Sequence, residues 1–175
     1  MKNILCLLLT ALQLSACALL EKQHRELPAS VLGLLSPGQS TTGEVTAKLG
    51  SPNMKVSLPD NETAWIYLNK ESKSTRLSII FDTPKSVIKS IHWFASSTDP
   101  EVQLNTAKKQ FANDTFTAAS SSWINPHASP DEVIYNNADS TVHIALRKSR
   151  NEVSAISKSD GSAVADRKPA SKFEL

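Results

Sequence analysis

The sequence predicts an α+β fold: two short helices packed on a three-stranded antiparallel meander, followed by a second, degenerate unit of a helix and further strands. The spacing of apolar residues changes from a helical period to a period of two in the middle of the chain, and that alternation returns toward its end. Hydrophobic residues make up 40% of the 175 positions, which is typical of a globular protein. The net charge of +2 gives no basic excess, so we expect no nucleic-acid binding.

Residues 1–16 are predicted to form a signal peptide. Lys2 precedes an apolar run of about 14 residues, which is shorter than the roughly 20 that a spanning helix needs. Residues 14–17 read Leu-Ser-Ala-Cys, which resembles a bacterial lipobox: an apolar residue, two small ones and a cysteine whose sulfur accepts a diacylglyceryl group before cleavage. We therefore predict lipid attachment at Cys17. The alternative is ordinary secretion with Cys17 as a free thiol.

The predicted lipid places the protein at a membrane. Each buried CH₂ group contributes about 0.8 kcal/mol, and two acyl chains are enough for stable anchoring. Ala18 follows the cysteine, and by resemblance to sorted lipoproteins this favours the periplasmic face of the outer membrane. Residues 17–26 then form a lipidated tether. Because Cys6 lies in the leader, we expect no disulfide within the mature chain.

Two helices are predicted to open the first unit, residues 27–94. Apolar residues recur at helical spacing over residues 27–35. Thr41 and Glu44 then form a capping box, which pairs two otherwise unsatisfied backbone donors at the start of a second helix. Gly50 ends that helix.

Strands follow, because apolar residues then alternate with polar ones between short turns. The predicted strands of the first unit are residues 64–68, 76–81 and 87–94. The second unit, residues 95–157, has a small-residue linker, a helix near 102–111 and strands at 131–135, 141–146 and 153–156. A shift of 65 positions superimposes four apolar residues of the two units, which fits either an internal repeat or strands that extend one sheet. Residues 158–175 are polar and aperiodic, so we expect a mobile tail.

Catalytic and metal-binding motifs are missing from the sequence. It has no G-x-S-x-G motif, no His-x-x-x-His or Cys-x-x-Cys pair, and no phosphate-binding glycine spacing. His92 and His143 each stand alone on a predicted strand, where a solvated sheet face is the simplest interpretation. We predict no catalytic residues, no metal and no cofactor.

Four large aromatic residues allow two interpretations. Trp65, Tyr67, Trp93 and Trp123 either pack in the core or emerge on the sheet face that the helices leave uncovered. In the second case they would form an aromatic patch that binds a partner protein.

Five segments taken together resemble the BamE-type lipoprotein family, also called SmpA/OmlA. They are residues 35–41, 44–45, 49–52, 65–67 and 77–81. The resemblance spans residues 34–93 and implies two helices followed by three antiparallel strands. It also implies an accessory role in folding β-barrels into the outer membrane, through partner proteins and anionic lipid. The chain departs from the family by one extra residue between Gly38 and Thr41 and by residues 95–156, which the short members lack.

The expected function is therefore that of a membrane-anchored, non-enzymatic scaffold or accessory factor in outer-membrane and β-barrel assembly. Its expected partners are the membrane, through the lipid, and envelope proteins such as barrel-assembly subunits. An alternative is a tandem-domain binding or inhibitor module that resembles the β-lactamase inhibitor protein fold, with the four aromatic residues near its contact surface. A third is an enzyme, which His92 or His143 beside a carboxylate in a deep pocket would reveal.

Overall fold

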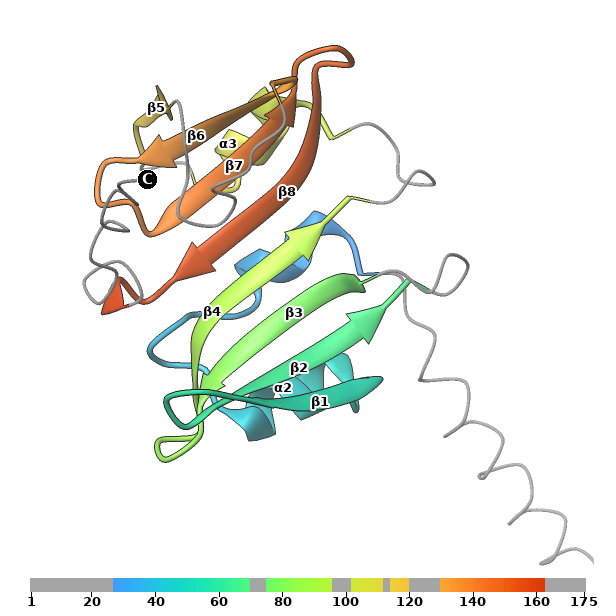
Figure 1. The fold of residues 1–175 in the computed structure, drawn as a ribbon, viewed down its shortest axis with the longest axis vertical. Helices are drawn as coiled ribbons and strands as arrows, with labels where there is room; N and C mark the ends of the chain where they lie inside the picture. The colour runs from blue at the N-terminus through green and yellow to red at the C-terminus, as the bar shows by residue number, and fades with distance from the viewer. Residues whose placement is uncertain (1–26, 70–74, 96–101, 112–113, 120–129, 163–175) are drawn as a thin grey trace, which may run out of the picture.

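The computed structural model describes residues 27–69, 75–95, 102–111, 114–119 and 130–162. These residues form one continuous eight-stranded antiparallel sheet in the order β1-β2-β3-β4-β8-β7-β6-β5 (Figure 1). The strands are β1 (Met54–Leu58), β2 (Glu62–Leu68), β3 (Thr75–Asp82), β4 (Val87–Phe94), β5 (Phe116–Ala119), β6 (Glu132–Asn137), β7 (Val142–Arg147) and β8 (Glu152–Ser159). The helical elements are a 3₁₀ turn η2 (Ala29–Gly33) and the α-helices α2 (Thr42–Leu49) and α3 (Leu104–Lys109).

The predicted fold class is wrong. The described chain is dominated by one sheet of eight strands with only short helices, and not by helices packed on a separate three-stranded unit. The difference arises at the junction between β4 and β8, where Trp93 pairs with Ile156 and Phe94 with Ala155. An antiparallel meander leaves an unpaired strand at its edge, and joining two such edges removes both.

The strand order is symmetric about this junction. Reading outward from it, each half of the sheet presents its fourth, third, second and first strand. The shifted apolar pattern allowed either an internal repeat or strands that extend one sheet. The strand order fits both, because two halves with the same strand order are joined in a single sheet. Strand β8 ends at Ser159, inside the segment predicted as a tail, and residues 163–175 lie outside the described part of the chain.

The capping box at the start of α2 is confirmed. The Thr41 hydroxyl accepts a hydrogen bond from the Glu44 N–H at 3.3 Å, and the Glu44 carboxylate accepts one from the Thr41 N–H at 2.9 Å. The helix ends where Gly50 adopts φ +73°, a conformation that favours glycine. By contrast, the first predicted helix is only a five-residue 3₁₀ turn.

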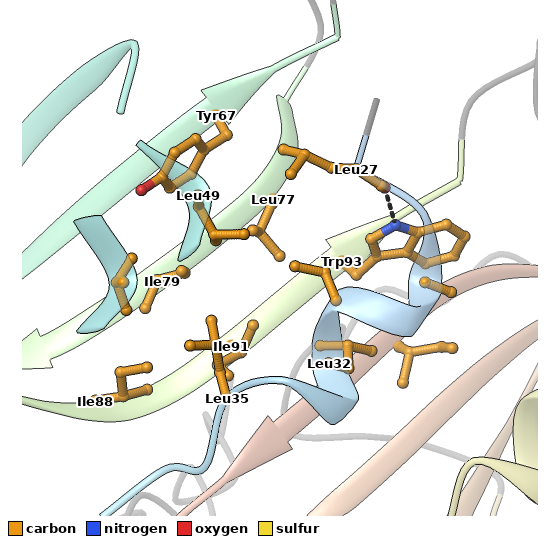
Figure 2. Close-up of a cluster of buried hydrophobic side chains, with 14 of the residues drawn as sticks. Leu27, Leu32, Leu35, Leu49, Tyr67, Leu77, Ile79, Ile88, Ile91 and Trp93 are labelled. Carbon is orange, nitrogen blue, oxygen red and sulfur yellow. Dashed lines mark hydrogen bonds between the residues drawn. The ribbon is translucent and has the colours of Figure 1, made fainter. Parts of the chain in front are cut away.

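All described helical elements lie on one side of the sheet. In Figure 1, η2 and α2 lie behind the first four strands, and α3 lies behind β6 and β7. The core fills the space between these elements and the sheet, and Figure 2 shows a cluster of its buried hydrophobic side chains. Its labelled members are Leu27, Leu32, Leu35, Leu49, Tyr67, Leu77, Ile79, Ile88, Ile91 and Trp93.

The Leu27 carbonyl anchors the chain where it enters the domain. It accepts a hydrogen bond from the Trp93 indole N–H at 2.9 Å (Figure 2). It accepts a second from the Arg76 Nε at 3.0 Å. The Arg76 guanidinium also lies 4.4 Å from the centre of the Trp93 ring, a favourable cation–π distance. Strands β3 and β4 therefore hold the segment that follows the predicted tether.

Candidate binding surface on the helix-free face

The side of the sheet that no described helix covers carries a row of polar residues. Successive cross-strand pairs join Ser78 of β3, His92 of β4, Ser157 of β8, His143 of β7 and Asn136 of β6. Residues that face each other across a ladder lie on the same face of a sheet. The row therefore crosses the junction between the two halves.

His92 links two hydroxyl groups within this row. Its Nδ1 lies 2.9 Å from the Ser157 Oγ, and its Nε2 lies 3.0 Å from the Ser90 Oγ. A hydroxyl beside an imidazole is the pairing that serine hydrolases use to activate a nucleophile. Here, however, Ser157 lies on β8, which pairs with β4 on one side and β7 on the other, so the backbone N–H groups around it bond to neighbouring strands instead of facing a ligand. The pairing is best explained as a structural hydrogen-bond chain.

His143 is nearly inaccessible, with 3% of its surface exposed. Its Nδ1 lies 2.6 Å from the Asn136 Oδ1, and its Nε2 lies 2.8 Å from the Ser140 carbonyl oxygen. Burial lowers the pKa of His143, and the hydrogen bond to the Ser140 carbonyl partly opposes that shift. Both partner atoms are oxygens that accept hydrogen bonds, and a neutral imidazole ring carries one N–H, so the neutral ring donates to only one of them at a time.

A cavity of about 450 Å³ opens on the same face and spans the junction. Of the described residues, ten line it: Phe94, Ala95, Glu132, Ile134, His143, Ala145, Arg147, Ser154, Ala155 and Ser157. Its volume lies within the roughly 300–1,000 Å³ of typical ligand pockets. Small side chains on β7 and β8 leave the hollow, because Ala145 and Ala155 face each other across the ladder.

Two charged residues, Glu132 and Arg147, are among those that line the cavity. Glu132 and Arg147 face each other across β6 and β7, and the Glu132 Oε1 accepts a hydrogen bond from the Ser154 Oγ at 3.0 Å. His143 and Glu132 line the same cavity, but they stand four positions apart along the paired strands, or about 13 Å at ~3.3 Å per residue. They do not form an acid–base pair. The arrangement is suited to holding a molecule that is apolar in part and polar at its edges.

Three of the four predicted contact residues lie in the core. The exposed fractions of Trp65, Tyr67 and Trp93 are 7%, 3% and 0%. Trp65 packs against Phe81 with ring centres 4.8 Å apart, and the Tyr67 hydroxyl donates to the Gly50 carbonyl at 3.2 Å. These three residues therefore form no exposed aromatic patch, and their side chains face the helices because they pair with core positions of β3. Trp123 and the lipid-attachment residue Cys17 lie outside the described residues.

The cavity was missed at the level of sequence. Alanine and serine carry no chemical motif, and of the lining residues only His143 stands out as a candidate site residue. Glu132 and Ile134 are two positions apart on β6, so their alternation predicts that they share a face of the sheet. Which residues of β4, β7 and β8 lie beside them depends on the pairing register, which the sequence does not show.

The described residues contain no group of three or more His, Cys, Asp and Glu side chains that could hold a metal ion. Within the same part of the chain, no helix has the length and apolar character needed to cross a membrane.

No protein-family model matches this chain, and no curated protein matches it. Two solved structures show low similarity to this chain. One is a DUF4309 family protein, YjgB, from Bacillus subtilis subsp. subtilis str. 168, with 16% identity and a TM-score of 0.42 over 72% of this chain and 82% of that one. The other is an extracellular protein containing an SCP domain from Bacillus anthracis str. Ames, with 10% identity and a TM-score of 0.42 over 81% of this chain and 50% of that one.

Proposed function

We propose that the protein is a lipid-anchored, non-enzymatic binding module of the cell envelope, and that its contact surface is the helix-free face of the sheet. The observation that carries the proposal is the cavity of about 450 Å³ across the junction of the two halves. Its described lining combines five apolar residues with five polar or charged ones. Apolar surface with polar groups that fix the orientation of a bound molecule is usual in a binding site.

A protein fits this face better than a small molecule does. Apolar side chains continue beyond the cavity along the same face, because Ile66 and Ile80 are partly exposed there and Met54 is 51% exposed. A small ligand would leave these residues in water. A partner that places one side chain in the cavity and packs along the sheet would cover them.

The predicted lipid anchor would hold the binding face close to the membrane. The nine residues between Cys17 and Leu27 can span at most about 30 Å when fully extended, at ~3.3 Å per residue. The domain would then work within that reach of the membrane surface, where membrane-associated partners are concentrated. The narrower role in outer-membrane and β-barrel assembly rests on the family resemblance and remains part of the proposal.

In-cell photo-crosslinking tests the binding face directly. A benzoylphenylalanine at Ala145 places the crosslinker in the cavity, and the same residue at Thr106 places it on exposed α3, on the other side of the sheet. We expect a discrete protein adduct from position 145 and none from position 106. Absence of an adduct from 145, or the same adducts from both positions, would contradict the proposal. Barrel-assembly subunits in the adduct would support the narrower role.

Fractionation tests the anchor. Cys17→Ala is expected to release the protein from membranes and to block processing of the leader, because the acceptor sulfur is lost. Cys6→Ser is the matched control, since that cysteine lies in the predicted leader and its loss should change neither property. Unchanged membrane association of the Cys17→Ala protein would rule out a lipid anchor at this residue.

A further inference from the structure

Strand β1 forms one edge of the sheet and pairs only with β2 among the described strands. Its outer backbone groups therefore face away from the sheet and can accept another strand. Met54, Val56 and Leu58 alternate along the helix-free face, and all three are at least partly exposed. An exposed edge with an apolar row on one face is a site for strand addition.

We propose that β1 pairs antiparallel with β1 of a second copy of this chain, with the two-fold axis at Val56. This register places Val56 opposite Val56 of the second copy and Met54 opposite Leu58 of the second copy. Directly opposed residues share a face in an antiparallel pair, so the apolar row of one copy meets that of the other.

The charges of the strand agree with this register. Lys55 is the only charged residue of β1, and the pairing sets it opposite Ser57 of the second copy and not opposite its own symmetry mate. A lysine on an edge strand often blocks association. Here the Lys55 Nζ lies 4.2 Å from the centre of the Trp65 ring on β2, so the side chain turns back over the sheet and leaves the edge open.

The symmetry suits two anchored molecules. The two-fold axis of an antiparallel strand pair is perpendicular to the sheet, so both copies keep their helical elements on the same side. The chain enters each copy at Leu27, which packs on that side against Trp93. Both tethers would then start from the same side and could reach one bilayer. Shared anchoring raises the effective concentration, which a five-residue strand pair needs to associate.

The opposite edge of the sheet is less suited to this pairing. Strand β5 has only four residues, and Ala118 and Ala119 replace the larger apolar side chains of β1. Thr117 on β5 is exposed, so it offers a matched control position at an edge that the proposal leaves unpaired.

Charge reversal across the axis provides the test. Two differently tagged full-length copies are co-expressed and one is purified from detergent-solubilised membranes. Wild-type copies should co-purify. Val56→Lys in both copies, or Val56→Glu in both, should reduce recovery at least tenfold, because like charges meet at the axis. Val56→Lys in one copy with Val56→Glu in the other should restore recovery to within twofold of wild type. Thr117→Lys in both copies should have no effect.

Three results would overturn the proposal. The first is failure of wild-type copies to co-purify. The second is full recovery with Val56→Lys in both copies. The third is no rescue by the Lys–Glu combination while each variant keeps the wild-type thermal unfolding midpoint, which shows that it is folded. A different protein bound at the β1 edge would give one of these outcomes.

Discussion

The two halves of the sheet share one strand order but are filled differently. The first half packs β1–β4 against η2 and α2, and most of the large, fully buried side chains belong to it. Among the described residues of the second half, α3 contributes one buried residue, Ala107, while Leu104 of α3 and Phe111, which follows the helix, are only partly buried. The second half instead provides most of the lining of the cavity.

This difference indicates that the first half stabilises the sheet and the second half provides most of the binding site. A well-packed layer on one face of β1–β4 fixes the sheet and holds the chain at Leu27, close to the predicted tether. The second half carries most of the small and polar residues that line the cavity on the helix-free face. The β4–β8 pairing joins the well-packed half to the half that provides most of the cavity.

Trp93→Ala should produce the largest loss of stability. The side chain is fully buried, and the substitution removes its packing and the hydrogen bond to the Leu27 carbonyl. We expect the free energy of unfolding to fall by about 3–5 kcal/mol, measured by urea denaturation. Trp93→Phe keeps a ring and loses the N–H, so its effect should be smaller. A loss below about 1 kcal/mol for Trp93→Ala would show that the first half is not the stable one.

A matched pair of leucines compares the halves directly. Leu32 on η2 is fully buried, whereas Leu104 on α3 is partly exposed. Leu32→Ala should lower the free energy of unfolding by about 2–5 kcal/mol, and Leu104→Ala by a clearly smaller amount. Equal losses in the same denaturation experiment would remove the difference in packing between the halves.

Thr41→Ala should have a smaller effect, confined to the first half. It removes the side-chain acceptor that caps α2, which typically costs about 1 kcal/mol. Thr46→Ala is the control, because the exposed Thr46 hydroxyl only bonds back to the Thr42 carbonyl within the same helix. Thermal unfolding of both variants should show a lower midpoint for the first alone. A similar midpoint for the two variants would mean that the cap adds nothing.

His143 should give the second half a modest dependence on pH. Its pKa is below the ordinary value of 6.5 in the folded protein, so the unfolded chain takes up a proton first as the pH falls. The free energy of unfolding should therefore decrease below pH 6.5 until the folded pKa is reached, and His143→Gln should remove this decrease. An unchanged pH profile in the variant would exclude this histidine as the cause.

Three carboxylates act in a different pH window. Hydrogen bonds lower the pKa values of Asp82, Asp131 and Asp139 from the ordinary 3.8. Their contribution is present above that value and is lost only as the pH falls through it. Unfolding measured between pH 7.5 and 5 therefore leaves these carboxylates out, and the comparison with His143→Gln separates His143 from the other three histidines of the chain.

The sequence predicted individual elements better than their assembly. The capping signal at Thr41 and the alternation in β3 and β7 are local, so they could be read directly. Strand β1 was not predicted, although Met54, Val56 and Leu58 alternate with polar residues along it. The pairing of β4 with β8 could not be predicted, since a strand shows the same alternation whichever strand lies beside it.

The candidate site was beyond the reach of the sequence for a related reason. Aromatic residues are obvious candidates for a contact surface in a sequence, but Trp65 and Trp93 are buried in the core. The cavity forms where two small side chains, Ala145 and Ala155, lie opposite each other. Their pairing can be recognised only when the register of β7 and β8 is known.

The central claim is that the helix-free face binds a partner through its cavity, and a cavity-filling substitution tests it most directly. Ala145→Trp places an indole in the cavity, and Thr106→Trp adds the same group to exposed α3 on the other side of the sheet. The affinity of each full-length variant for the partner captured from position 145 is measured by titration. We predict that Ala145→Trp weakens binding at least tenfold, or about 1.4 kcal/mol, while Thr106→Trp leaves it unchanged. Wild-type affinity in a folded Ala145→Trp protein would contradict the claim.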